Sequence, residues 1–143
     1  MKQFIVLLAI LPLLLVFFVQ FSMDQMNHAR VGLLLDYVYT AKEEAKQQGC
    51  FTPELKETLR ENIAQAFDIP PHTILIQTTD SVRYRMMQGD DTSEDAFERG
   101  LIYYKISVPI AEMMAGRRLF GIKEEDNTCY YTIESYTASE LLP

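Results

Sequence analysis

The chain has 143 residues, of which 48% are hydrophobic, and a formal net charge of −7. This length suits one small domain with a single core. The acidic balance disfavours nucleic acid as a partner, because phosphate backbones need a basic surface, and the main basic cluster is the short segment Gly116 to Lys123. The sequence has no phosphate-binding glycine loop, zinc-ligand spacing, nucleophile elbow or paired catalytic carboxylates. We therefore expect no enzyme activity, cofactor, metal or small-molecule substrate.

The first predicted element is a membrane anchor over residues 1–23. The run from Phe4 to Val19 contains no polar side chain, and fourteen of its sixteen residues are Leu, Ile, Val or Phe. Such a composition favours membrane insertion by about 4 to 8 kcal/mol. Extension through Met23 gives about twenty residues, enough to cross a hydrocarbon core of about 30 Å. The anchor residues spaced along this segment are Phe4, Leu7, Leu11, Leu14 and Phe18.

Retention of the anchor is favoured over its removal as a signal peptide. A cleavage site needs small residues after the apolar run, whereas the segment from Phe17 to Met26 reads FFVQFSMDQM. A cleaved signal remains the alternative. Lys2 precedes the apolar run and Asp24 follows it, so the positive-inside rule predicts a cytoplasmic N-terminus and a body outside the membrane.

The apolar pattern continues as an amphipathic helix over residues 24–49. Gly49 is a natural stop, and no proline lies between Gln20 and Gln48. A single helix from about residue 3 to residue 48 is therefore expected, roughly 70 Å long. Its apolar stripe, widened by Leu34 and Val38, recurs at helical steps through Met26, Ala29, Leu33, Tyr37, Ala41 and Ala45.

Residues 50–143 predict a compact α+β head outside the membrane. Thr52 and Pro53 open a second helix that ends near Asp68. A hairpin, a strong strand, a short helix or crossing loop and a final strand should follow, giving a roughly four-stranded antiparallel sheet packed on the amphipathic helix. The four predicted strands are Thr73 to Thr79, Val82 to Met87, Leu101 to Val108 and Thr128 to Ala138.

Two cysteines are the candidates for a covalent link within the head. A disulfide between Cys50 and Cys129 would close a loop of about 80 residues and stabilise the fold by roughly 4 to 5 kcal/mol. Two separate buried thiols are the alternative, because sequence alone does not bring the two residues within reach.

Two further groups of side chains have both a structural and a functional interpretation. The acidic segment Gln88 to Asp95 is expected to be a solvated loop, since it lacks the spacing of a calcium loop; its possible ligands are Asp90, Asp91, Glu94 and Asp95. Tyrosines suit an interface because they offer apolar area and a polar tip, although strand tyrosines also serve as core residues. The candidate interface residues are Tyr37, Tyr104, Tyr130 and Tyr136.

The order of these elements resembles that of pilins and pseudopilins, and most closely the TadE-like minor subunits of Tad (tight adherence) pili and related conjugation-element membrane proteins of Gram-positive bacteria. The residues that carry the resemblance are MNHARVGLLLDYVYTAKEEAKQQG, FTPELKETLRENIAQAFDIPPHTILIQTT, GLIYYKISVPI and the closing strand that ends in SE. The chain differs from prepilins in having one leader charge and no glutamate in its apolar run.

The resemblance implies a subunit that works by assembly. Its partners would be membrane lipid and other pilin-like subunits, because lateral packing between helices can replace lipid contacts. A membrane-tethered binding or sensory domain that works alone is the alternative. That domain would have a hinge near Gln20 to Gln25.

Overall fold

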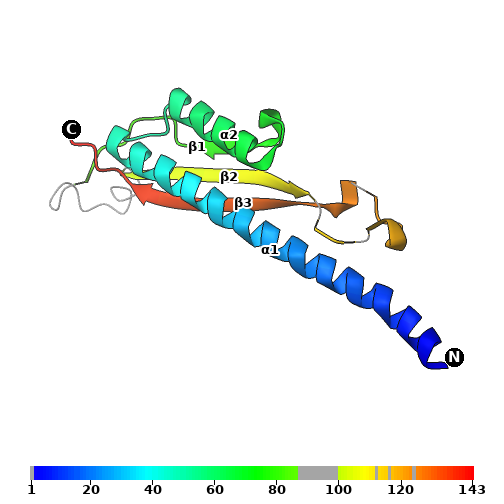
Figure 1. Ribbon diagram of the computed structural model, residues 1–143. Coiled ribbons are helices and arrows are strands. Elements are labelled where there is room, and N and C mark those ends of the chain that lie inside the picture. Colours follow the sequence, from blue (N-terminus) through cyan, green and yellow to red (C-terminus); the bar gives the residue numbers. More distant parts are fainter. Residues whose placement is uncertain (1, 87–99, 112, 116, 124) are drawn as a thin grey trace. The chain divides into compact units, whose positions relative to one another are not determined.

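The computed structural model describes residues 2–86, 100–111, 113–115, 117–123 and 125–143. It is an α+β protein with a long N-terminal helix, a second helix and a three-stranded antiparallel sheet (Figure 1). The elements in chain order are α1 (Lys2–Gln48), α2 (Pro53–Phe67), η1 (Pro71–Thr73), β1 (Leu75–Thr78), β2 (Leu101–Ala111), η2 (Arg117–Phe120), η3 (Glu125–Asn127) and β3 (Thr128–Ala138).

The chain divides into two compact units. Unit 1 comprises Met1–Gly32 and Pro109–Tyr130, and unit 2 comprises Leu33–Val108 and Tyr131–Pro143. Helix α1 and strands β2 and β3 each have residues in both units.

Helix α1 confirms the single long helix expected from the sequence, and it contains Pro12 without ending there. It stops where predicted, because Gly49 has a φ of +79°. A side chain is excluded at this position: a Cβ on Gly49 would lie 2.5 Å from the carbonyl oxygen of Arg83. The glycine therefore allows both the left-handed turn and the close approach of residue 83.

Helix α2 has the ends that its sequence predicts. The Thr52 side chain accepts a hydrogen bond from the Leu55 backbone N–H at 3.3 Å, and Pro53 fills the first turn. Asp68 ends the helix in the left-handed conformation, with a φ of 53°. Between these caps, Leu55, Leu59 and Ile63 form the buried stripe.

The sheet has the order β1-β2-β3. Strand β1 pairs antiparallel with β2, so that Leu75 lies opposite Ser107 and Gln77 opposite Lys105. Ile102, Tyr104, Ile106, Val108 and Ile110 of β2 are buried on one face, because successive side chains point to opposite faces of a sheet; Ser107, on the other face, is buried as well. The first of these faces is covered by helix; the other is called the open face below.

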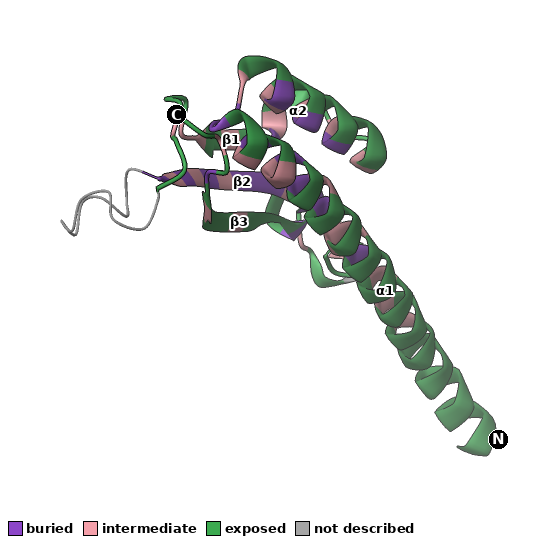
Figure 2. Ribbon diagram, turned by 90° about the vertical axis from the view of Figure 1, so that its left-hand side faces the viewer, coloured by how far each residue is buried: buried purple, intermediate pink, exposed green. Residues whose placement is uncertain are grey.

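The core of unit 2 lies between the sheet, α2 and the second half of α1. Figure 2 shows buried residues along β2 and on the inner sides of both helices. Helix α1 contributes Leu34, Val38, Ala41 and Ala45. All four belong to the stripe expected from the sequence, whereas two of its other members, Met26 and Leu33, are 41% and 39% exposed. Among the residues that the structure describes, the largest fully buried side chains are Phe51, Leu34, Ile63, Ile102, Ile106 and Val108.

The second strand of the predicted hairpin is absent from the described residues, so the sheet has three strands where four were expected. Residues 82–86 belong to no strand, and their backbone bonds to separate segments. The Arg83 backbone N–H donates to Gly49 O at 2.8 Å, and that of Arg85 donates to Leu141 O at 2.7 Å. The Ser139 hydroxyl donates to Arg83 O at 2.7 Å. These tertiary bonds satisfy the backbone that a neighbouring strand would otherwise pair with.

The predicted acidic loop lies outside the described residues, and so do its possible calcium ligands Asp90, Asp91, Glu94 and Asp95. The excursion between β2 and β3 contains two short 3-10 helices, η2 and η3, where the sequence predicts a short helix or crossing loop followed by a turn.

Candidate membrane anchor and contact surface

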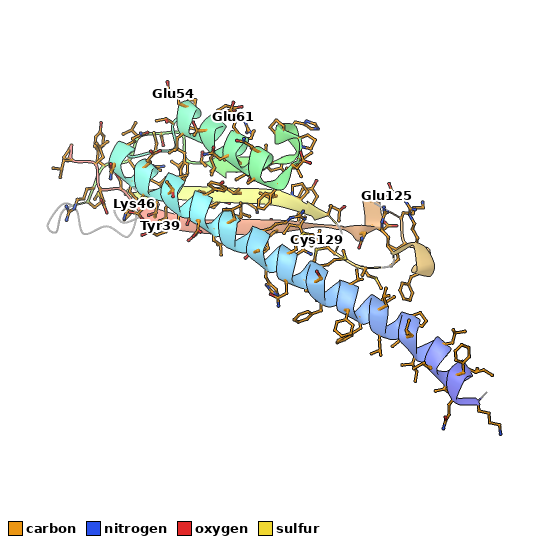
Figure 3. All side chains as sticks on the ribbon, viewed as in Figure 1. Tyr39, Lys46, Glu54, Glu61, Glu125 and Cys129 are labelled. Atoms are coloured by element: carbon orange, nitrogen blue, oxygen red, sulfur yellow. The ribbon has the colours of Figure 1, made fainter. Side chains whose placement is uncertain are left out.

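The first part of α1 is long and apolar enough to cross a membrane. Its most apolar window has a mean hydropathy of 2.9, and none of that window is buried within the chain. The side chains of this part stand out around the helix without cover (Figure 3). The five predicted anchor residues are 49% to 69% exposed: Phe4, Leu7, Leu11, Leu14 and Phe18. A helix apolar on all sides needs an apolar environment to cover it.

A polar cluster in unit 1 begins directly after the apolar run, at Gln20. The Gln20 side-chain amide donates to Met113 O at 3.0 Å and accepts from the Ala115 N–H at 2.8 Å. The same amide also donates to the Asp24 carboxylate at 3.0 Å. The excursion between the strands is thereby fastened to α1. The sequence gives no signal for these bonds, since Gln20 and Met113 are 93 residues apart.

Asn127 organises the excursion itself. Its side chain accepts from the Met114 N–H at 2.8 Å and donates to Met114 O at 3.3 Å, while its backbone oxygen accepts from the Met113 N–H at 3.3 Å. Asn127 is 5% exposed and Ala115 is 3% exposed. Both ends of the excursion are thus joined in unit 1 by part-buried hydrogen bonds.

The open face of the sheet in unit 2 carries a row of cross-strand pairs. Three contacts join β2 to β3: the rings of Tyr103 and Tyr136 lie 5.2 Å apart, Lys105 Nζ lies 3.0 Å from a Glu134 carboxylate oxygen, and the hydroxyls of Ser107 and Thr132 are 2.8 Å apart. From one pair to the next, the residue number increases by two on β2 and decreases by two on β3. This is the pattern of two antiparallel strands.

Glu134 links two of these pairs. One of its carboxylate oxygens accepts a hydrogen bond from the Tyr103 hydroxyl at 2.9 Å, and the other faces Lys105. The bonds from Lys105 and, to a smaller extent, Tyr103 lower the pKa of Glu134. Conversely, the bond to Glu134 raises the pKa of Tyr103 and that of Lys105. Exposed ion pairs add little stability, so this group mainly orients the Tyr103 ring.

Replacement of Glu134 should be visible in the titration of Tyr103. In Glu134→Gln we expect the pKa of Tyr103 to fall toward its ordinary value of 10.0, because the carboxylate that favours the neutral phenol is gone. Tyrosine ring NMR against pH measures this change. Glu140→Gln is the matched control, since Glu140 pairs with Lys46 and should leave Tyr103 unaffected. An unchanged Tyr103 pKa in Glu134→Gln would contradict the contact.

The contribution of Glu134 to folding stability depends on pH. Because the pKa of Glu134 is lowered in the folded chain, its contribution to stability is present above the unfolded value and is lost as the pH falls through the folded value. The stability difference between the wild-type chain and Glu134→Gln should therefore vanish at the acid end of a denaturation series.

The four candidate interface tyrosines lie in different environments. Tyr130 and Tyr136 are 57% and 63% exposed and remain available for contact. Tyr104 is 7% exposed and packs in the core, with its ring 5.8 Å from that of Phe51, so its expected place at an interface is corrected. Tyr37 is half-buried against the same core. Tyr103, which the sequence does not single out, lies on the open face because it alternates with Tyr104.

The two cysteines are free thiols, and the structure contains no disulfide between them. Cys50 is buried, whereas Cys129 is exposed at the start of β3 (Figure 3). In the native, reduced protein we expect Cys129 to react with a maleimide much faster than Cys50, because a buried thiol must wait for local opening. Peptide mass spectrometry after a timed reaction measures both rates. Equal rates, or protection of both thiols until a reductant is added, would contradict these environments.

Within the described residues, no group of three or more His, Cys, Asp or Glu side chains could hold a metal ion.

A hollow on unit 2 is lined by Lys46, Arg85 and the end of β3, and Lys46 Nζ lies 2.8 Å from a Glu140 carboxylate oxygen there. That bond is the first of the causes that raise the pKa of Lys46. On α2, Glu54 and Glu61 point away from the sheet (Figure 3).

No protein-family model, curated protein or solved structure matches the chain.

Proposed function

We propose that this chain is a pilin-like, single-pass membrane subunit of a Tad-type pilus or a related envelope assembly. It acts by helix packing in the membrane and by contacts of its head, without catalysis. The N-terminus lies in the cytoplasm and unit 2 lies outside. The observation that carries the proposal is the continuity of α1, which runs from the apolar run of Phe4 to Val19 into the buried stripe that begins at Leu34.

The unbroken course of α1 supports assembly, because one part of the helix packs in the protein core and the other part needs an apolar cover from outside the chain. The buried residues of its second half pack in the core of unit 2, whereas none of its most apolar window is buried. Lipid covers such a surface in a single subunit, and neighbouring helices can replace the lipid in an assembly. No break separates the two halves at Gln20 to Gln25, where a flexibly tethered domain would have its hinge.

The open face of unit 2 supports contacts between heads. Tyr136 and Leu75 are 63% and 57% exposed on the sheet, and Glu134 holds Tyr103 in place beside Tyr136. Exposed aromatic side chains of fixed orientation lose little entropy when a partner covers them.

Crosslinking in intact membranes tests the proposal. Single cysteines are placed at successive positions from Phe4 to Tyr39, in a background with Cys50→Ala and Cys129→Ser. We expect disulfide-linked dimers at positions that recur with helical spacing along the apolar run. The same variants diluted in detergent are the control for random collision.

An absence of crosslinks at every position of the apolar run would contradict assembly and would favour the tethered, solitary domain. Crosslinks of equal yield at all positions, with no helical spacing, would also contradict a specific helix interface.

A further inference from the structure

The excursion between β2 and β3 lies at the depth of the membrane surface if α1 spans the bilayer. Gln20 is the residue directly after the apolar run and lies in the last turn of the anchor over residues 1–23. Two hydrogen bonds, at 3.0 and 2.8 Å, join its side chain to the backbones of Met113 and Ala115. Residues 113–115 therefore lie beside the last turn of the spanning segment, within the same unit.

The side chains that extend from this point combine apolar and basic character. Phe120 is 60% exposed, and Met113 and Met114 are 40% and 38% exposed. Between Met113 and Lys123 the sequence carries Arg117, Arg118 and Lys123 and no acidic residue. In the sequence, Glu112 precedes this basic segment and three acidic residues follow it at 124–126; Lys123 Nζ lies 3.7 Å from a Glu125 carboxylate oxygen.

We propose that η2 and the residues before it form a second membrane contact, in which the exposed Arg118 binds the phosphate of a phospholipid headgroup and Phe120 enters the boundary of the acyl chains. Aromatic rings and arginine side chains are suited to this layer, because each has an apolar part and a polar or charged end. Arginine also matches the geometry of phosphate oxygens. This inference rests on the membrane span of the proposed function.

The position of the excursion also explains how a polar residue, Gln20, can lie next to the apolar run. An amide at the edge of the hydrocarbon core is unfavourable unless its hydrogen bonds are satisfied. In the structure its Nε2 donates to Met113 O and to Asp24, and its Oε1 accepts from Ala115. The excursion thus supplies hydrogen-bond partners for the Gln20 amide near the end of the span, and lipid headgroups would cover the excursion in turn.

Tryptophan fluorescence tests the contact directly, because the chain contains no tryptophan. In Phe120→Trp the new indole is the only one, and its position is exposed, so the fold should be retained. The full chain is reconstituted into phosphatidylcholine vesicles whose lipids carry bromine at a shallow acyl position. We expect blue-shifted emission that the brominated lipids quench.

Two other single-tryptophan variants calibrate the result. Leu11→Trp reports on the span and should be quenched most by lipids brominated deep in the acyl chains. Leu142→Trp, at an exposed position in unit 2, should emit as an indole in water and stay unquenched. Arg118→Glu added to Phe120→Trp should shift the emission back to the red and reduce its quenching, because the reversed charge is repelled by lipid phosphate.

Each outcome separates the two proposals. Quenching of Leu11→Trp without quenching of Phe120→Trp would overturn the second contact and leave the span in place. Quenching of neither would overturn both. Quenching of Phe120→Trp that Arg118→Glu leaves unchanged would overturn the role of the arginine at the phosphates.

Discussion

Leu34→Ala should lower the free energy of unfolding by about 2 to 5 kcal/mol, the cost of removing a fully buried leucine from a packed core. Leu34 is 0% exposed and packs in the core of unit 2 from the second half of α1. Because the neighbouring structure relaxes only in part, a cavity remains where the side chain was. Urea denaturation of the full chain in mild detergent, followed by circular dichroism, measures the change.

The next residue provides the matched control. Leu35 is 46% exposed on the same helix, so Leu35→Ala removes the same atoms from a surface position and should change stability by less than about 0.5 kcal/mol. Equal effects of the two substitutions would contradict the docking of α1 in the core of unit 2.

The double variant Leu11→Arg/Leu14→Arg should remove the chain from the membrane. Two arginines near the centre of a span cost about 5 to 7 kcal/mol, and the loss of two leucines costs about 1 kcal/mol more. The whole apolar run favours insertion by only about 4 to 8 kcal/mol, so the two substitutions remove the net free energy that favours insertion. We expect the full-length chain to leave the carbonate-resistant membrane fraction of expressing cells, as measured by immunoblot.

The control for this variant places the same two charges elsewhere on α1. Leu33→Arg/Leu35→Arg changes two positions that are 39% and 46% exposed beyond the apolar run, and it should stay in the membrane fraction. Retention of the first double variant in the membrane would contradict a spanning role for Phe4 to Val19. Intact mass establishes whether the first residues are still attached.

The helices of this chain could be predicted from its sequence because their signals are local. A capping threonine, a first-turn proline and a stop glycine each act within one turn, and the structure has Thr52, Pro53 and Gly49 in these roles. The apolar run could likewise be recognised from its composition and length alone. The α+β class followed from these helices and from two strongly strand-forming segments, now β2 and β3.

The misplaced features depend on contacts between distant segments. The segment that begins at Val82 has a strand-like sequence, yet its backbone bonds to Gly49 and Leu141, which no local pattern indicates. Tyr104 and Tyr103 are adjacent and chemically equal, and only the side of the sheet that the helices cover decides which one is core. The bonds of Gln20 to Met113 and Ala115 depend on the path of the excursion, so the proposed lipid contact was not accessible from the sequence.

Spin-label accessibility along α1 is the most direct test of a helix that begins in lipid and continues into the core of unit 2. Single labels are placed at each position from Phe4 to Gln48 in the reconstituted chain, and collision rates are measured with oxygen and with a water-soluble reagent. The account predicts oxygen contact and no water contact throughout Phe4 to Val19. Beyond Gly32 it predicts a helical period whose minima fall at Leu34, Val38, Ala41 and Ala45. Water contact throughout the apolar run, or a loss of helical period at Gln20 to Gln25, would contradict it.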